Sequence, residues 1–167
     1  MPRTPDDLFA FLQSHGIETT TVDHPPLYTV EDAKLLRGAV EGAHTKNLFL
    51  KDKKGNLFLV VIQADATVDL KALPPIIGAS GRLSFGSPDL LLEVWGVVPG
   101  AVSPFGALND TAARVTVVLD AALEQSQKLN HHPLVNTKTT TILREDLVRF
   151  LRATGHDPKI LPVGAAA

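Results

Sequence analysis

Residues 47–62 read NLFLKDKKGNLFLVVI, which is two apolar runs joined by a polar segment. Short apolar runs bounded by turn residues are typical of buried strands. The segment between them is rich in lysine and ends in Gly55 and Asn56, residues that favour a turn. We therefore predict strands over residues 47–50 and 57–62 that pair as a β-hairpin.

Helical signals lie on both sides of this hairpin. Near the start, Thr4 can cap a helix, Pro5 suits its first turn, and Gly16 can end it. Near the end, Leu147 and Phe150 share one face of another helix. We predict helices over residues 5–15, 30–36 (capped by Thr29), 90–95 and 144–153, a helical turn over 69–73, and further strands over 19–22, 115–119 and 137–143.

These elements follow one another without a regular βαβ repeat, and no change of composition marks a linker. A chain of 167 residues is about the size of one domain and can bury a core. The sequence therefore predicts a single α+β domain over residues 1–167, with a mixed, curved, barrel-like sheet and helices packed around it.

Composition narrows the function classes. With 44% hydrophobic and 20% charged residues the chain is of ordinary globular type, and the absence of cysteine excludes disulfides and a cysteine nucleophile. The start lacks the order of a signal peptide, and no apolar run approaches the about 18 residues of a membrane span. We expect a soluble, cytoplasmic protein. Its net charge of -2 disfavours a general duplex binder, so a nucleic acid would be held by a local patch.

Several familiar chemistries are disfavoured by spacing. Residues 38–46 resemble a phosphate loop, but Lys46 does not directly follow the second glycine. There is no HExxH and no GxSxG motif. His131 and His132 are adjacent, so on a strand they would point to opposite faces rather than chelate one metal ion. We expect neither a metal nor a cofactor.

Three segments can carry chemistry. Lys46 and Asn47 stand at the start of a predicted strand, where a lysine can supply a charge or a donor. Residues 100–106, GAVSPFG, can offer backbone N–H groups to an oxyanion. Residues 131–137, HHPLVNT, set His132 beside a proline that fixes the backbone. By itself each segment also suits a surface lysine, a plain turn or a structural histidine.

In this order the three segments resemble one family, the free-standing relatives of the prolyl-tRNA synthetase editing domain (the YbaK/ProX group). Its lysine corresponds to Lys46, its GxxxP loop to residues 100–104, and its His-Pro-x-x-Asn segment to residues 132–136. The Ser-Pro-Phe-Gly continuation is similar to the ProX branch. The likeness extends from about Thr4 to Leu161, nearly the whole chain.

The resemblance implies a hydrolase that cleaves the ester between a wrong amino acid and the 3′ end of tRNA, without a protein nucleophile. The ProX branch implies Ala-tRNA(Pro) as substrate, the acceptor end of tRNA(Pro) as partner, and prolyl-tRNA synthetase as a further partner. It assigns catalytic roles to Lys46, Asn47, Gly100, Ser103, Pro104, Gly106 and His132. It assigns substrate contacts to Leu27, Ile62, Arg82, Phe105, Leu134 and Asn136, of which Arg82 would meet tRNA phosphates together with Lys51, Lys53, Lys54 and Lys138.

Other functions remain open at this point. The same hydrolase could take Cys-tRNA or Ser-tRNA, because the motifs do not define the size of the pocket. A nucleic-acid-binding module on the same scaffold would bind in a salt-sensitive way and cleave no ester. A partner-interaction module would leave the three motifs as turns.

Overall fold

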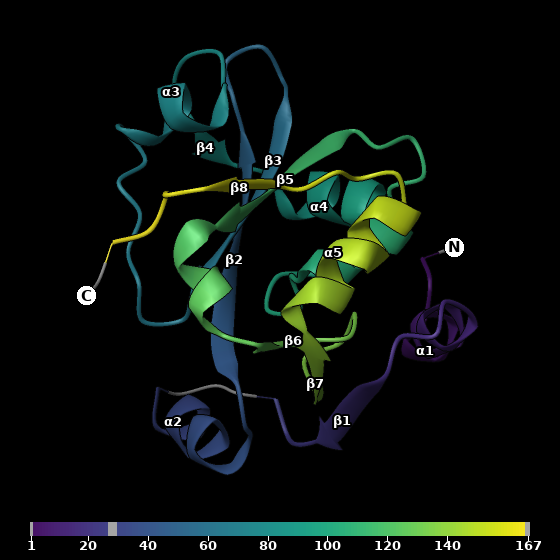
Figure 1. Cartoon of the computed structure of the whole chain (residues 1–167). Coiled ribbons are helices and arrows are strands. Elements are labelled where there is room, and N and C mark those ends of the chain that lie inside the picture. The colour runs from purple at the N-terminus through teal and green to yellow at the C-terminus, as the bar shows by residue number, and fades with distance from the viewer. Residues whose placement is uncertain (1, 27–29, 166–167) are drawn as a thin grey trace.

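The computed structural model describes residues 2–26 and 30–165, in which helices and strands alternate along the chain (Figure 1). The α-helices are α1 (Pro5–Ser14), α2 (Val30–Ala39), α3 (Leu73–Ile77), α4 (Pro88–Trp95) and α5 (Arg144–Ala153), and the 3-10 helices are η1 (Pro104–Leu108) and η2 (Ala121–Gln125). The strands are β1 (Thr19–Asp23), β2 (Ala43–Lys51), β3 (Leu57–Gln63), β4 (Ser84–Phe85), β5 (Val115–Asp120), β6 (Lys128–His131), β7 (Lys138–Leu143) and β8 (Lys159–Leu161).

The strands form one mixed sheet in the order β1-β7-β6-β2-β3-β5-β8, and β4 pairs with β2 outside this path. Three neighbouring pairs are parallel (β2–β6, β3–β5 and β5–β8), and the remaining pairs are antiparallel. The predicted α+β class with a mixed sheet is thus confirmed. The sheet is not closed into a barrel, because β1 and β8 lie at its two edges.

The predicted hairpin is strands β2 and β3, which pair antiparallel with Asn47 opposite Val61. Asp52 organises the turn between them, because its carboxylate accepts hydrogen bonds from the backbone N–H groups of Lys54 and Asn56. The strand β2 begins at Ala43, four residues before the predicted start, and these added residues border the cavity described below.

The apolar run of β3 is continuous because both of its faces are buried. Leu57, Leu59 and Val61 belong to one hydrophobic cluster, while Phe58 and Val60 belong to the other. The helices α1, α4 and α5 contribute to the first cluster and lie on the same side of the sheet in Figure 1. The helix α3 packs on the second cluster.

Local signals set the helix boundaries. Thr4 and Asp7 form a capping box at the start of α1, and Ser87 caps α4. The helical turn predicted for residues 69–73 is present, because the backbone N–H groups of Ala72 and Leu73 donate to the carbonyl oxygen of Asp69. The helix α3 follows from Leu73, with prolines in its first turn. Thr29 lies outside the described residues. No helix in the described ranges is both long and apolar enough to cross a membrane.

Candidate active site

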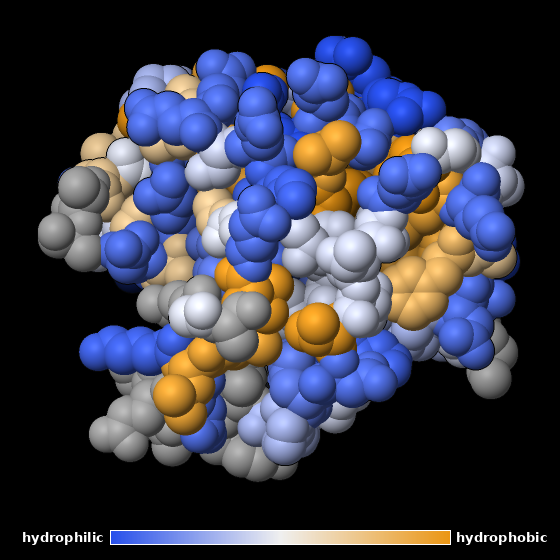
Figure 2. Space-filling view, turned by 60° about the horizontal axis from the view of Figure 1, so that its bottom comes forward, coloured by the Kyte–Doolittle hydropathy of each residue, from blue (hydrophilic) through white to orange (hydrophobic). Residues whose placement is uncertain are grey.

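A cavity of about 390 Å³ opens where β2 begins, at the end of the sheet near α2. Its walls come from the first half of β2, the segment before η1, and the end of β6 with the residue after it. Figure 2 brings this end of the molecule forward and shows apolar and hydrophilic side chains interspersed on its surface. The lining residues are Leu36, His44, Thr45, Lys46, Asn47, Ala64, Gly100, Val102, Asn130, His131, His132 and Thr139.

Lys46 and Asn47 both line the cavity, although neighbouring side chains on a strand point to opposite faces. The Nδ2 atom of Asn47 donates to the carbonyl oxygen of Val102 over 3.1 Å, which ties β2 to the loop before η1. Lys46 is half-buried and makes no hydrogen bond or ion pair with the described residues. Its ammonium group is therefore free to meet a ligand.

The loop at residues 100–102 forms one part of the cavity wall. Gly100 has a φ of 92°, a conformation that glycine adopts without strain. Gly100 and Val102 line the cavity, and within the described part of the chain their N–H groups donate to no other atom. These two groups are suitable donors for an oxygen that gains negative charge.

Two neighbouring histidines line the opposite wall. The Nδ1–H group of His132 donates to the carbonyl oxygen of Lys138 over 2.9 Å. Burial lowers the pKa of His132, and His24 lowers it further, against the effect of that hydrogen bond. Burial, with His132 and His44, also holds the pKa of His131 at about 3. Both rings are therefore neutral at neutral pH.

Four of the predicted residues, Lys46, Asn47, Gly100 and His132, thus meet at one cavity. Asn136 lies beside it, since a methyl group on Gly100 would be 3.8 Å from its Nδ2 atom.

The continuation of the glycine loop does not reach the cavity. Ser103 is fully buried and caps η1: its hydroxyl oxygen accepts from the N–H of Phe105, and its carbonyl oxygen accepts from the N–H of Gly106. Pro104 is buried in the first turn of η1. The polar backbone groups of these residues are therefore used inside the loop. Phe105 is a core residue, and its ring meets that of His131 edge-on at 5.7 Å between centroids.

The other predicted substrate contacts are dispersed. Ile62 is fully buried in the second hydrophobic cluster, and Leu134 is buried in the first. Arg82 is exposed just before β4, which pairs with the end of β2 farthest from the cavity. Lys51, Lys53 and Lys54 belong to that same distant end. Leu27 lies outside the described residues. The structure does not bring these side chains to the cavity.

Sequence reasoning missed several lining residues because it missed β6. Lys128–His131 is too short and too polar to show the pattern of a strand. Its Asn130 donates from Nδ2 to the carbonyl oxygen of Glu41, which fixes the start of β2. The hydroxyl of Thr45 bonds both the Asn130 carbonyl oxygen and the His131 ring, each over 2.8 Å. Only the last residue of this strand, His131, belongs to a segment that the sequence marks, residues 131–137.

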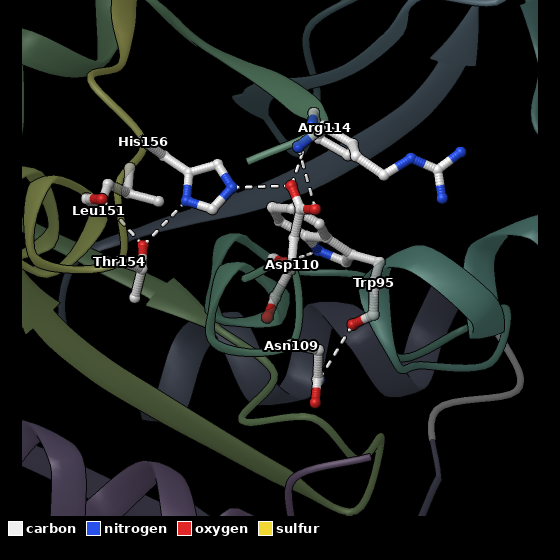
Figure 3. Close-up of polar contacts among 9 residues, drawn as sticks. Trp95, Asn109, Asp110, Arg114, Leu151, Thr154 and His156 are labelled. Atoms are coloured by element: carbon white, nitrogen blue, oxygen red, sulfur yellow. Dashed lines mark hydrogen bonds and ion pairs between the residues drawn. The ribbon is translucent and has the colours of Figure 1, made fainter. Parts of the chain in front are cut away.

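A buried network of hydrogen bonds, drawn in Figure 3, holds the loop before η1 from the interior of the protein. The indole N–H of Trp95 donates to the carbonyl oxygen of Ser103 over 2.7 Å. The Trp95 ring also lies edge-on to His156, and Nε2 of His156 is 2.8 Å from the carboxylate of Asp110. The side chains of His156 and Asp110 are at most 2% exposed. The position of the loop therefore depends on groups that never touch the cavity.

Gly106→Ala is expected to destabilise the fold by about 1–3 kcal/mol, because the added methyl would overlap the indole of Trp95 in a packed core. Urea unfolding followed by circular dichroism measures this change. Gly38→Ala is the matched control, since its methyl meets no atom within 4 Å and alanine favours the helix. Equal stability of the Gly106→Ala protein and wild type would contradict a packing role for this glycine.

The cavity combines one free ammonium group, two residues with unpaired backbone N–H groups and three imidazoles, of which those of His131 and His132 are neutral, and no carboxylate is among its described lining residues. No cluster of three or more metal-ligating side chains occurs in residues 2–26 and 30–165. Such a set of groups can stabilise negative charge on an oxygen and orient a polar substrate. Its hydroxyl–histidine contact, between Thr45 and His131, is a poor nucleophile–base pair, because burial holds the pKa of His131 at about 3.

Comparisons of this chain with a family model and with known proteins point to the same family. Residues 24–150 match the model of the aminoacyl-tRNA editing domain. The chain is 40% identical over 157 residues to prolyl-tRNA synthetase associated domain-containing protein 1 of Danio rerio, covering 93% of this chain and 85% of that protein. It is 38% identical over 155 residues to the prolyl-tRNA editing protein ProX of Acetoanaerobium sticklandii, covering 92% and 94%.

The fold has solved counterparts. A crystal structure described as a candidate trans-editing enzyme for prolyl-tRNA synthetase superposes with a TM-score of 0.71, covering 96% of this chain and 98% of that one. At 21% identity this likeness shows the fold alone.

Proposed function

Because the chain belongs to the aminoacyl-tRNA editing domain family, whose members are deacylases, we propose that it hydrolyses the ester of mischarged tRNA(Pro), with alanine as the amino acid removed. One observation carries the proposal. The free ammonium group of Lys46 lines the same cavity as the unpaired N–H groups of Gly100 and Val102. These are the groups that an ester needs for stabilisation of a tetrahedral oxyanion.

The proposed mechanism needs no protein nucleophile. An aminoacyl ester is already activated, so positioning of water and stabilisation of charge suffice. Water attacks the carbonyl carbon, and the resulting oxyanion accepts hydrogen bonds from the N–H groups of Gly100 and Val102. The intermediate then collapses with cleavage of the bond to the ribose oxygen, which takes up a proton. The neighbouring ribose hydroxyl can assist the attacking water.

The side chains divide the remaining tasks. Lys46 anchors the carbonyl oxygen or the terminal phosphate through its charge. Asn47, held by Val102, and His132, held by Lys138, orient the substrate from opposite walls. At about 390 Å³ the cavity has the size of a small-molecule site, with room for an amino acid and part of the terminal nucleoside.

The choice of alanine follows from the problem that an editing enzyme solves. The aminoacylation site of a synthetase that accepts proline cannot strongly exclude the smaller alanine, because each methylene group changes the binding free energy by only about 1–3 kcal/mol. A second site can exclude proline by size and hydrolyse the alanyl ester. The relatives named for prolyl-tRNA editing and for prolyl-tRNA synthetase support tRNA(Pro) as the partner and the cytoplasm as the place of reaction.

Single-turnover deacylation of a panel of charged tRNAs tests the proposal. Ala-tRNA(Pro), Pro-tRNA(Pro), Cys-tRNA and Ser-tRNA are each incubated with excess enzyme, and spontaneous hydrolysis is subtracted. We expect Ala-tRNA(Pro) to be hydrolysed at least about tenfold faster than Pro-tRNA(Pro). If Cys-tRNA or Ser-tRNA is hydrolysed faster than Ala-tRNA(Pro), the protein is a deacylase with that other substrate. Cleavage of none of the four would refute the proposal.

A further inference from the structure

Two residues that line the cavity, Asn47 and His131, each carry a buried polar atom without a hydrogen-bond partner. In the described part of the chain three buried side-chain polar atoms lack a hydrogen-bond partner, and two of them, Oδ1 of Asn47 and Nε2 of His131, belong to residues that line the cavity. An unsatisfied buried polar atom is costly, and such atoms are rare in native proteins. Two of them at one cavity indicate that a ligand supplies the missing partner.

Both atoms must be acceptors. The amide of Asn47 is oriented by its Nδ2 atom, which donates to the Val102 carbonyl oxygen, so Oδ1 points elsewhere. The single hydroxyl proton of Thr45 is used on the Asn130 carbonyl oxygen, since two acceptors would otherwise face each other at 2.8 Å. Nδ1 of His131 must therefore donate to Thr45, which leaves Nε2 with a lone pair.

The lone pair persists at neutral pH. Burial and the neighbouring His132 and His44 hold the pKa of His131 at about 3, so the ring carries no charge. A group with so low a pKa is a poor general base at neutral pH. It can, however, accept a hydrogen bond from a cation without the repulsion that a protonated ring would cause.

The geometry of β2 separates Asn47 and His131, which are held on one face of the strand, from Lys46, which lies on the other. Thr45 and Asn47 share one face of β2, and Thr45 holds His131 to that face. Lys46 lies between them in the sequence and points to the other face. Asn47 and His131 therefore approach the cavity from one face of β2 and Lys46 from the other.

We propose that Asn47 Oδ1 and His131 Nε2 form the subsite for the α-ammonium group of the aminoacyl ester. This inference rests on the proposed function. Near the scissile bond the ester oxygens are only acceptors, and a ribose hydroxyl has one proton to donate. The ammonium group carries three N–H donors and can satisfy both atoms at once. Hydrogen bonds to charged groups are stronger than those between neutral groups, so this subsite discriminates in favour of the ammonium group.

The test compares two esters of the same tRNA(Pro), alanyl and lactyl, in which a hydroxyl replaces the ammonium group. Rates are expressed relative to spontaneous hydrolysis of each ester. Wild type is expected to prefer the alanyl ester by about tenfold or more. His131→Leu is expected to remove most of that preference by slowing the alanyl reaction, while the lactyl rate changes little. His131→Gln, which can offer an amide oxygen, is expected to keep part of it.

The controls separate this role from a structural one. A retained lactyl rate shows that the His131→Leu protein is folded, and His15→Leu, which removes an exposed histidine directly after α1, is expected to affect neither ester. Equal losses on both esters in the His131→Leu protein, or no preference in wild type, would overturn the subsite.

A binding measurement keeps the subsite testable if no ester is cleaved. The ¹⁵N resonance of His131 Nε2 is followed in wild type while the alanyl amide of 3′-amino-3′-deoxyadenosine is added, with the lactyl amide as the matched control. A shift with the alanyl compound alone supports the subsite even where deacylation fails. The absence of a shift with the alanyl compound at saturation would overturn it.

Discussion

Lys46→Met is expected to slow single-turnover deacylation of Ala-tRNA(Pro) by at least about 100-fold while leaving the unfolding temperature unchanged. The Lys46 ammonium group lines the cavity and is committed to no partner in the described residues, so its loss removes charge stabilisation without breaking an internal contact. Methionine keeps the apolar stem of the lysine side chain. It also changes the β propensity of this position in β2 only a little. Rapid-quench kinetics and thermal unfolding measure the two effects.

Two further variants sharpen this experiment. Lys51→Met removes a lysine from the same strand at the end remote from the cavity, and its rate should match wild type. Lys46→Arg keeps the charge but changes its shape and reach, so an intermediate rate is expected. A Lys46→Met protein that is as fast as wild type would remove Lys46 from the mechanism and leave the backbone N–H groups as the main stabilisers.

Asp110→Asn and His156→Leu are each expected to reduce the free energy of unfolding by about 1–3 kcal/mol, because each disrupts the buried hydrogen bond between these two side chains and leaves a buried polar group without its partner. The Asp110 carboxylate also accepts from the backbone N–H groups of Arg114 and Val115 (Figure 3). Urea unfolding at neutral pH measures the loss. The double replacement Asp110→Leu with His156→Leu should recover part of it, since no buried charge then remains.

The same pair predicts an acid dependence of stability. Burial raises the pKa of Asp110, but the hydrogen bonds from His156, Val115 and Arg114 outweigh it and bring the pKa below its ordinary value of 3.8. The folded state therefore binds fewer protons than the unfolded chain in this range. The stabilisation is complete above pH 3.8 and is lost as the pH falls through the folded pKa. Asp110→Asn should flatten this part of the stability curve; an unchanged slope between pH 4 and 2 would assign acid unfolding to other carboxyls.

The sequence predicts the parts of the fold that local chemistry decides. The cap at Thr4, the helix over residues 144–153 and the hairpin around Asp52 carry their own signals of capping, periodicity and turn formation. The strands β6 and β8 carry no such signals, because Lys128–His131 and Lys159–Leu161 pair with β2 and β5, strands that lie far from them in the sequence. The open path of the sheet depends on the same long-range pairings.

The residues of the candidate site were also predictable only in part. Lys46, Asn47, Gly100 and His132 belong to segments with a family likeness, and the structure brings all four to one cavity. Residues 103–106 belong to a segment with the same likeness, yet they form a buried 3-10 turn whose groups bond one another. His131 has no motif of its own. Its placement depends on one hydroxyl of Thr45 and one ring of Phe105, contacts between segments that lie far apart in the sequence.

The pairing of Asp110 with His156 shows how much of the chain is needed for a complete folded domain. The stretch that matches the family model ends at residue 150, and it begins after α1. His156 and the edge strand β8 lie beyond that end, while Leu8 and Leu12 of the first cluster lie before its beginning. The stretch that matches the family model is therefore shorter than the stretch that closes the core. A domain transplanted by its family boundaries would carry the cavity without the two ends that hold it in shape.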